Sequence, residues 1–153
     1  MKIFVVGSTG VLGRHVVPRL LERGHEVRTV ARKQEQVKQL QRIGVGAAVG
    51  DILDAQSLKR SAAGCEVALH LATAIPKPGA AQDWAPNDRV RREGTQNLLV
   101  ACHHAGIRRY VQQSTCFLYR YQRVCFTKGD GEFGSDGYSA KSSFVCVAYG
   151  LQF

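Results

Sequence analysis

Three glycines near the start of the chain, Gly7, Gly10 and Gly13, have the spacing of a phosphate-binding turn. They follow the β-branched and aromatic run over 3–6, which predicts a buried strand, and an apolar helical pattern begins before the last of them. Glycine lets the backbone turn sharply and approach a ligand closely. The first helical amides and the positive end of the helix dipole then favour an anion, most often the pyrophosphate of a dinucleotide. The residues predicted to hold it are Gly7, Thr9, Gly10, Val11, Leu12 and Gly13.

Strand and helix patterns alternate after this turn. Helices are predicted over 11–23, 35–43, 54–63 and 87–104, and strands over 25–31, 47–51, 65–72 and, after a loop, up to residue 115. Such alternation predicts an α/β fold, a doubly wound parallel sheet (Rossmann fold) of about five to six strands with helices on both faces. Ligands of these sheets bind at the carboxyl ends of the strands. The residues expected at those ends include Gly7, Arg32, Asp51, Ala72 and Thr115.

Composition narrows the classes of function. The 153 residues are 44% hydrophobic and 22% charged, as in one ordinary globular domain. No apolar run is long enough to span a membrane, and no signal-peptide pattern precedes the first strand. The five cysteines include no CxxC pair and the five histidines have no metal-ligand spacing, so we expect reduced thiols, no metal site and a cytoplasmic location. The net charge of +9 is scattered along the chain, so an anionic dinucleotide explains it better than nucleic acid does.

The residues around the glycines resemble a known family. Segment 6–14 has the sequence VGSTGVLGR, which resembles the GxxGxxG loop of the short-chain dehydrogenase/reductase superfamily, in its extended (epimerase/dehydratase-like) or atypical branch. The other main branch spaces its glycines four and two apart, which would need a glycine at Val11. Segment 94–99, GTQNLL, resembles the helix that packs under the active site of this family. Arg91 departs from the pattern, because the family has an asparagine there.

Cofactor choice is predicted from the residue after the second strand. An acidic residue there binds the ribose hydroxyl of NAD, whereas an arginine accommodates the 2′-phosphate of NADP. Arg32 therefore favours NADP over NAD, with a solvated basic turn as the alternative. The GDILD segment over 50–54 resembles the adenine-binding element of the family, which implies adenine contacts for Asp51 and Ile52, although Asp51 could instead cap the next helix. Ala72 and Thr73 resemble the small residues that follow this strand in the family and lie against the cofactor, which implies the same contact here.

Catalytic residues are implied only by the resemblance. Thr115 matches the serine or threonine that hydrogen-bonds the substrate, and Tyr138 and Lys141 resemble the family's Tyr-x-x-x-Lys pair, in which lysine lowers the pKa of the tyrosine acid/base. Their spacing is three rather than four, and the glycine- and serine-rich segment 127–143 has a loop composition. A chance pairing in a polar tail therefore remains the alternative.

The resemblance covers residues 1–119, expected to form the dinucleotide-binding domain. Segment 120–153 matches nothing recognisable; we expect one further strand or partial disorder there. Because extended family members are longer, we expect a chain that is shortened, frame-altered, a fragment or a minimal version. Two functions follow: an NADP(H)-preferring oxidoreductase or epimerase/dehydratase-like enzyme with an unknown small-molecule substrate, or a non-catalytic NADP(H)-binding sensor or regulator. The sequence does not decide whether the chain forms a homodimer.

Overall fold

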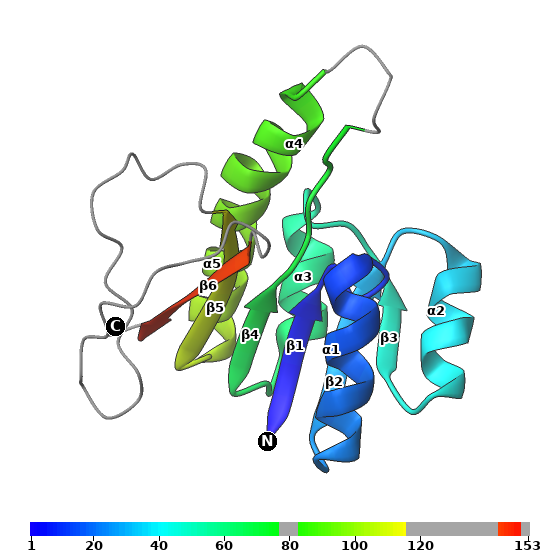
Figure 1. Cartoon of the computed structure of the whole chain (residues 1–153). Helices are drawn as coiled ribbons and strands as arrows, with labels where there is room; N and C mark the ends of the chain where they lie inside the picture. The colour runs from blue at the N-terminus through cyan, green and yellow to red at the C-terminus, as the bar shows by residue number, and fades with distance from the viewer. Residues whose placement is uncertain (77–82, 116–143, 151–153) are drawn as a thin grey trace, which may run out of the picture.

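The computed structural model describes residues 1–76, 83–115 and 144–150, in which strands alternate with helices (Figure 1). The strands are β1 (Lys2–Val6), β2 (Glu26–Ala31), β3 (Gly46–Val49), β4 (Val67–His70), β5 (Arg109–Thr115) and β6 (Phe144–Gly150). The helices are α1 (Val11–Glu22), α2 (Gln34–Arg42), α3 (Ala55–Ala62), α4 (Ala85–Arg89) and α5 (Thr95–Ala105), with a π turn, η1 (Val90–Gly94), between the last two. The strand predicted over 47–51 ends at Val49, so Asp51 lies in the following loop.

The described strands form one sheet in the order β3-β2-β1-β4-β5-β6. Every pair from β3 to β5 is parallel, with Ile3 of β1 opposite Val27 of β2 on one side and Val67 of β4 on the other. The predicted doubly wound parallel sheet is thereby confirmed over five strands. β6 differs, because it pairs antiparallel with β5 and makes this edge of the sheet mixed.

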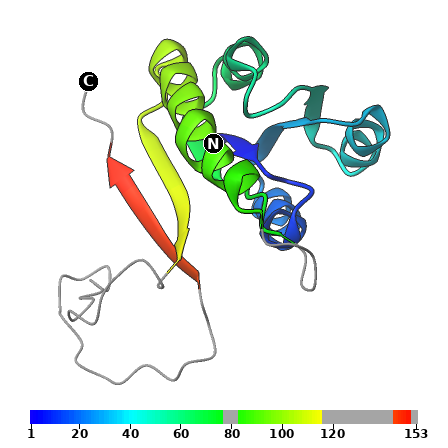
Figure 2. The same cartoon turned by 90° about the horizontal axis from the view of Figure 1, so that it is seen from above.

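The sheet is covered by helices on both faces (Figure 2). Residues of β1 alternate between the two faces, as the pleat of a strand requires. Ile3 and Val5 pack with buried residues of α1 and α2, whereas Phe4 and Val6 pack with α3 and α5. Because all four of these side chains are buried, β1 is a central strand, and it needed the continuous apolar run that the sequence shows.

The order in which strands are added to the sheet changes side between β1 and β4. The chain steps outward from β1 to β2 and β3, then returns through α3 to place β4 on the other side of β1. The loops that follow β1 and β4 therefore diverge at this point and leave a crevice above the strand ends, where ligands of such sheets bind. No helix among the described residues has both the length and the apolar character that crossing a membrane requires.

Candidate functional site

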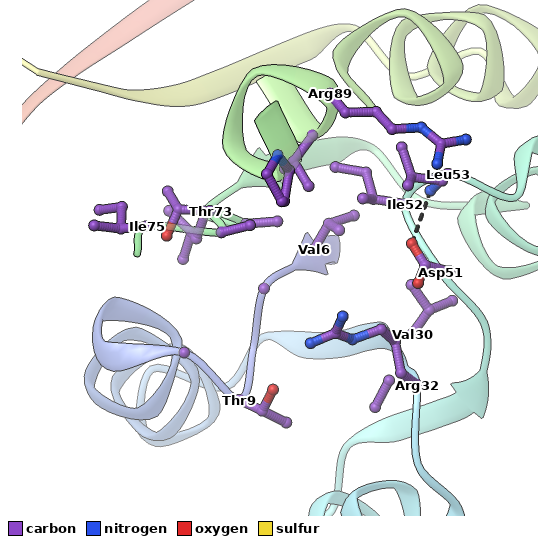
Figure 3. A pocket seen from close by; sticks show the side chains of 18 of the residues that line it. Val6, Thr9, Val30, Arg32, Asp51, Ile52, Leu53, Thr73, Ile75 and Arg89 are labelled. Carbon is purple, nitrogen blue, oxygen red and sulfur yellow. Dashed lines mark hydrogen bonds between the residues drawn. The ribbon is translucent and has the colours of Figure 1, made fainter. Parts of the chain in front are cut away.

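A cavity of about 820 Å³ lies above the carboxyl ends of β1, β2 and β4 (Figure 3). The loops after these strands and after β3 supply its walls, together with the start of α1 and with α4. The fold thus brings together side chains from distant parts of the sequence. Ten of the eleven residues predicted to bind the cofactor line it: Gly7, Thr9, Gly10, Val11, Leu12, Arg32, Asp51, Ile52, Ala72 and Thr73.

Gly7 and Gly13 are the tightest points of the glycine loop. Gly7 has φ +90°, and a Cβ added there would lie 2.5 Å from the backbone nitrogen of Ala72. Gly13 does not line the cavity; a Cβ at that position would collide with the carbonyl oxygens of Gly7 and Ser8. Gly7 therefore lets the loop pass over the end of β4, and Gly13 lets α1 press against the back of the same loop.

Ser8 and Thr29 anchor the loop from below. Both residues are buried, and the Thr29 hydroxyl lies 2.6 Å from the carbonyl oxygen of Val5 and 2.8 Å from the Ser8 hydroxyl. A hydroxyl has one proton, so Thr29 donates to Val5 and accepts from Ser8. This chain of hydrogen bonds ties the loop to β1 and β2, and it leaves the backbone amides that follow Ser8 in a fixed position.

The start of α1 has neither a side-chain cap nor an acidic residue in its first turn. Gly10 occupies the N-cap position. Gly10 donates its own N–H to the Gly7 carbonyl, at 3.1 Å, and its carbonyl accepts from Arg14, at 3.0 Å. The amides of the first turn and the positive end of the helix dipole are therefore available to an anion in the cavity.

The loop after β3 forms another wall of the cavity. The carboxylate of Asp51 accepts a hydrogen bond from the amide of Leu53, at 2.9 Å, which holds the loop in a turn. The alternative role for Asp51 as a helix cap is wrong, because Asp54 caps α3 through the amides of Gln56 and Ser57. The hydrogen bond from the Ser57 amide is the main cause that lowers the pKa of the Asp54 carboxyl. Asp51 is thus left to face the cavity.

Two asparagines form hydrogen bonds to the loops that line the cavity but are not part of the lining themselves. Asn97 of α5 donates to the carbonyl oxygen of Ile52 at 3.2 Å, and buried Asn87 of α4 accepts from the amide of Ala74 at 3.2 Å. A Cβ on Gly94 would lie 2.9 Å from the Ile52 side chain, so this glycine lets the helix approach the loop. Gly94 and Asn97 belong to the GTQNLL segment noted in the sequence, whereas no sequence pattern indicated Asn87.

Two arginines reach the cavity from different elements (Figure 3). Arg32 follows β2 at the position predicted for cofactor selection, and Lys33 next to it is not part of the lining. Arg89, the last residue of α4, was not indicated as a site residue by the sequence. Its only sequence signal is an i, i+4 pairing with Glu93, whose carboxylate lies 2.9 Å from the arginine Nε.

A buried histidine lies between β4 and α5. The Nδ1 atom of His70 lies 3.0 Å from the hydroxyl of Tyr110, which donates to Gln112 at 2.8 Å, and 3.4 Å from the hydroxyl of Thr95. Because the Tyr110 hydroxyl donates to Gln112, it can accept a hydrogen bond from a proton on Nδ1 of His70. The other nitrogen, Nε2, is buried and has no hydrogen-bond partner among the described residues. Burial, with a contribution from the positive charge of Arg91, lowers the pKa of His70 to about 4.

The predicted catalytic residues are only partly within the described chain. Thr115 is the final residue of β5, and Tyr138 and Lys141 lie outside the described residues. Gln113 of β5 is buried and lines the cavity, so this strand does reach the site. Among residues 1–76 and 83–115 no three His, Cys, Asp or Glu side chains are grouped to hold a metal ion.

Comparison with known proteins identifies relatives of this chain. Residues 7–142 match the family described as NAD(P)H-binding. A 4-hydroxy-2-methyl-3-oxo-4-farnesyl-3,4-dihydroquinoline-1-oxide ketoreductase from Stigmatella aurantiaca is 35% identical over 115 residues, which cover 75% of this chain and 34% of that protein. A 2-alkyl-3-oxoalkanoate reductase from Stenotrophomonas maltophilia is 36% identical over 115 residues, covering 75% of this chain and 33% of the reductase. The chain thus spans about a third of the length of these relatives.

A solved structure shows the same arrangement. The UDP-glucose 4-epimerase of Thermus thermophilus, determined in complex with NAD, superposes with a TM-score of 0.57 at 28% sequence identity. The superposition covers 71% of this chain and 35% of the epimerase.

Proposed function

Because this chain belongs to the NAD(P)H-binding family, we propose that its cavity binds NADP(H), with the pyrophosphate at the glycine loop and the adenosine end between Arg32 and the loop after β3. The observation that carries the proposal is the cradle formed by Gly7, Gly13 and the uncapped start of α1. The adenosine end is proposed to contact Asp51 and Ile52, and the opposite end Ala72 and Thr73.

The preference for NADP is proposed from the charge at Arg32. This side chain lines the cavity and has no ion pair within residues 1–76 and 83–115, so its charge is available to a 2′-phosphate. Arg32→Ala is expected to weaken NADPH binding roughly tenfold to hundredfold, as for a lost charge-assisted hydrogen bond, and to change NADH binding little. Calorimetric titration of both dinucleotides measures this, with Lys33→Ala as the matched control outside the lining. Equal dissociation constants of the wild-type chain for NADPH and NADH would contradict the preference.

We propose an oxidoreductase of the epimerase/dehydratase-like kind as the activity. The bound dinucleotide would supply or accept the hydride. Thr115 is proposed to hydrogen-bond the substrate and Tyr138 to move its proton, with Lys141 lowering the pKa of the tyrosine. The reductase activity of the two relatives supports this proposal. Because the chain covers only about a third of each relative, their substrates are not carried over to it.

Turnover separates this activity from the second candidate, a non-catalytic dinucleotide-binding regulator. The second candidate is favoured by the spacing of Tyr138 and Lys141, which is one residue shorter than in the family. We expect NADPH oxidation with a panel of carbonyl compounds, reduced about hundredfold or more in Tyr138→Phe, as for the loss of a general acid. Tight NADPH binding with no turnover, the same in both proteins, would instead support the regulator.

A further inference from the structure

Arg89 is the one arginine of α4, and although its side chain is 60% exposed, a hydrogen bond fixes it at the wall of the cavity. It lines the cavity next to Leu53 in the loop after β3 (Figure 3). Its Nε donates to a carboxylate oxygen of Glu93 at 2.9 Å, and this hydrogen bond is the main cause that raises the pKa of the guanidinium. The side chain is therefore held from its Nε edge, while the rest of the guanidinium plane stays available.

The π turn after Arg89 determines which way this side chain points. Five residues advance about 140° beyond a full turn of an α-helix, and less than that in the wider π-helix, in which residue i bonds to i+5. Arg89 and Gly94 are five residues apart and span η1. Gly94 lies against Ile52, so the π turn brings Arg89 towards the same side, over the loop of Ile52 and Leu53. A regular α-helix through this segment would turn Arg89 away from that loop.

The surroundings of Arg89 favour a flat, neutral group over a phosphate. Glu93 pairs with Arg89 directly, and the negative charge of Asp51 also acts on it. Two carboxylates at this position compensate the positive charge and would repel a phosphate dianion. Arg32, in contrast, has no ion pair in the parts of the chain that the structure describes, which makes it the phosphate partner. A guanidinium plane stacks well on an aromatic ring.

We infer that Arg89 stacks its guanidinium on the adenine ring of the bound dinucleotide, with Glu93 as the residue that positions it. This inference rests on the proposed binding of NADP(H) in the cavity. It makes Arg89 a contact for the base, which NAD and NADP share, and leaves discrimination between them to Arg32. The π turn η1 is then a functional feature of the helix, because it orients a binding residue.

The test uses calorimetric titration of the full chain with NADPH, NADH, AMP and nicotinamide mononucleotide. Arg89→Ala is expected to weaken binding of NADPH and NADH by the same factor, roughly three- to thirtyfold, the range from an exposed to a desolvated cation–π contact. AMP should lose affinity by a similar factor and nicotinamide mononucleotide should not. Arg89→Lys keeps the positive charge but lacks the planar guanidinium group. Its loss of binding free energy should therefore be more than half of the loss in Arg89→Ala. Arg92→Ala is the matched control, an exposed arginine of the same turn outside the cavity lining.

Each other outcome overturns the inference in a recognisable way. If the wild-type chain binds NADPH and Arg89→Ala binds both dinucleotides within twofold of wild type, Arg89 makes no contact with the base and the proposed function stands. A loss confined to NADPH would make Arg89 a phosphate ligand, and full rescue by Arg89→Lys would show that charge alone matters. If the wild-type chain binds neither dinucleotide, the proposed function and the inference are both wrong.

Discussion

Replacing Gly7 by alanine is expected to destabilise the fold by about 2–4 kcal/mol and to weaken NADPH binding roughly hundredfold. Two effects add at this position. The left-handed φ of +90° is unfavourable for a residue with a Cβ, and the new Cβ would lie 2.5 Å from the Ala72 nitrogen. The obstacle is backbone, which cannot swing aside as a flexible side chain does. The loop would move, and with it the amides proposed to bind the pyrophosphate. Urea denaturation and calorimetric titration with NADPH measure the two effects.

Gly64 offers a matched control for the backbone conformation alone. Its φ is +71°, but a Cβ added there would have nothing within 4 Å, and the residue is not part of the cavity lining. Gly64→Ala should therefore cost about 1–2 kcal/mol from the φ angle and leave the affinity for NADPH unchanged. If both variants lose the same free energy of unfolding, close contact with Ala72 is not what requires glycine at position 7.

The free energy of unfolding is expected to fall by about 3 kcal/mol between pH 6.5 and pH 4 because of His70. Burial lowers the pKa of His70 to about 4 in the folded chain, from 6.5 in the unfolded one. Above pH 6.5 His70 is neutral in both states and the stability is complete. Between the two pKa values only the unfolded state binds the proton, so stability is lost as the pH falls, by about 1.4 kcal/mol per pH unit. A proton on Nε2 would be buried without an acceptor among the described residues.

His70→Gln removes this titration and keeps a polar group near Tyr110. Its unfolding free energy, measured by urea denaturation from pH 7 to pH 4, should fall less steeply than that of the wild type, because the buried imidazole no longer contributes. His104→Gln, at an exposed position of α5, serves as the comparison and should keep the steep wild-type slope. Equal slopes for wild type and His70→Gln would show that His70 is not the group that titrates.

The sheet and the glycine loop were predictable because both depend on local order. An apolar run of strand length, three glycines and a helical period specify a strand, a turn and a helix start, whatever lies around them. The resemblance to the short-chain dehydrogenase/reductase superfamily is confirmed by the family match over 7–142 and by relatives that are reductases. The cap of α3 was less certain from the sequence, because Asp51 and Asp54 both precede that helix and only the structure shows that Asp54 caps it.

Contacts between distant segments were not predictable in this way. Asn87 meets Ala74 only because α4 lies beside the loop after β4, and no pattern around Asn87 records that neighbour. The single helix predicted over 87–104 contains a π turn, which nothing in its apolar period indicated. The antiparallel β6 was equally hidden, since an apolar run specifies a strand but not its direction.

The sequence by itself determined the order of the elements, the glycine turn before α1 and the charge at Arg32. These features follow from short-range preferences of the backbone and from the alternation of strands and helices along the chain. In such an alternation the parallel strands all end at the same edge of the sheet. Only the tertiary structure decided what surrounds the cavity: that Asp51 faces it, that Gly13 supports the loop from behind, and that Arg89 reaches it. Side-chain direction on a helix depends on its exact winding and packing, and a shift of one residue in η1 turns Arg89 by about 100°.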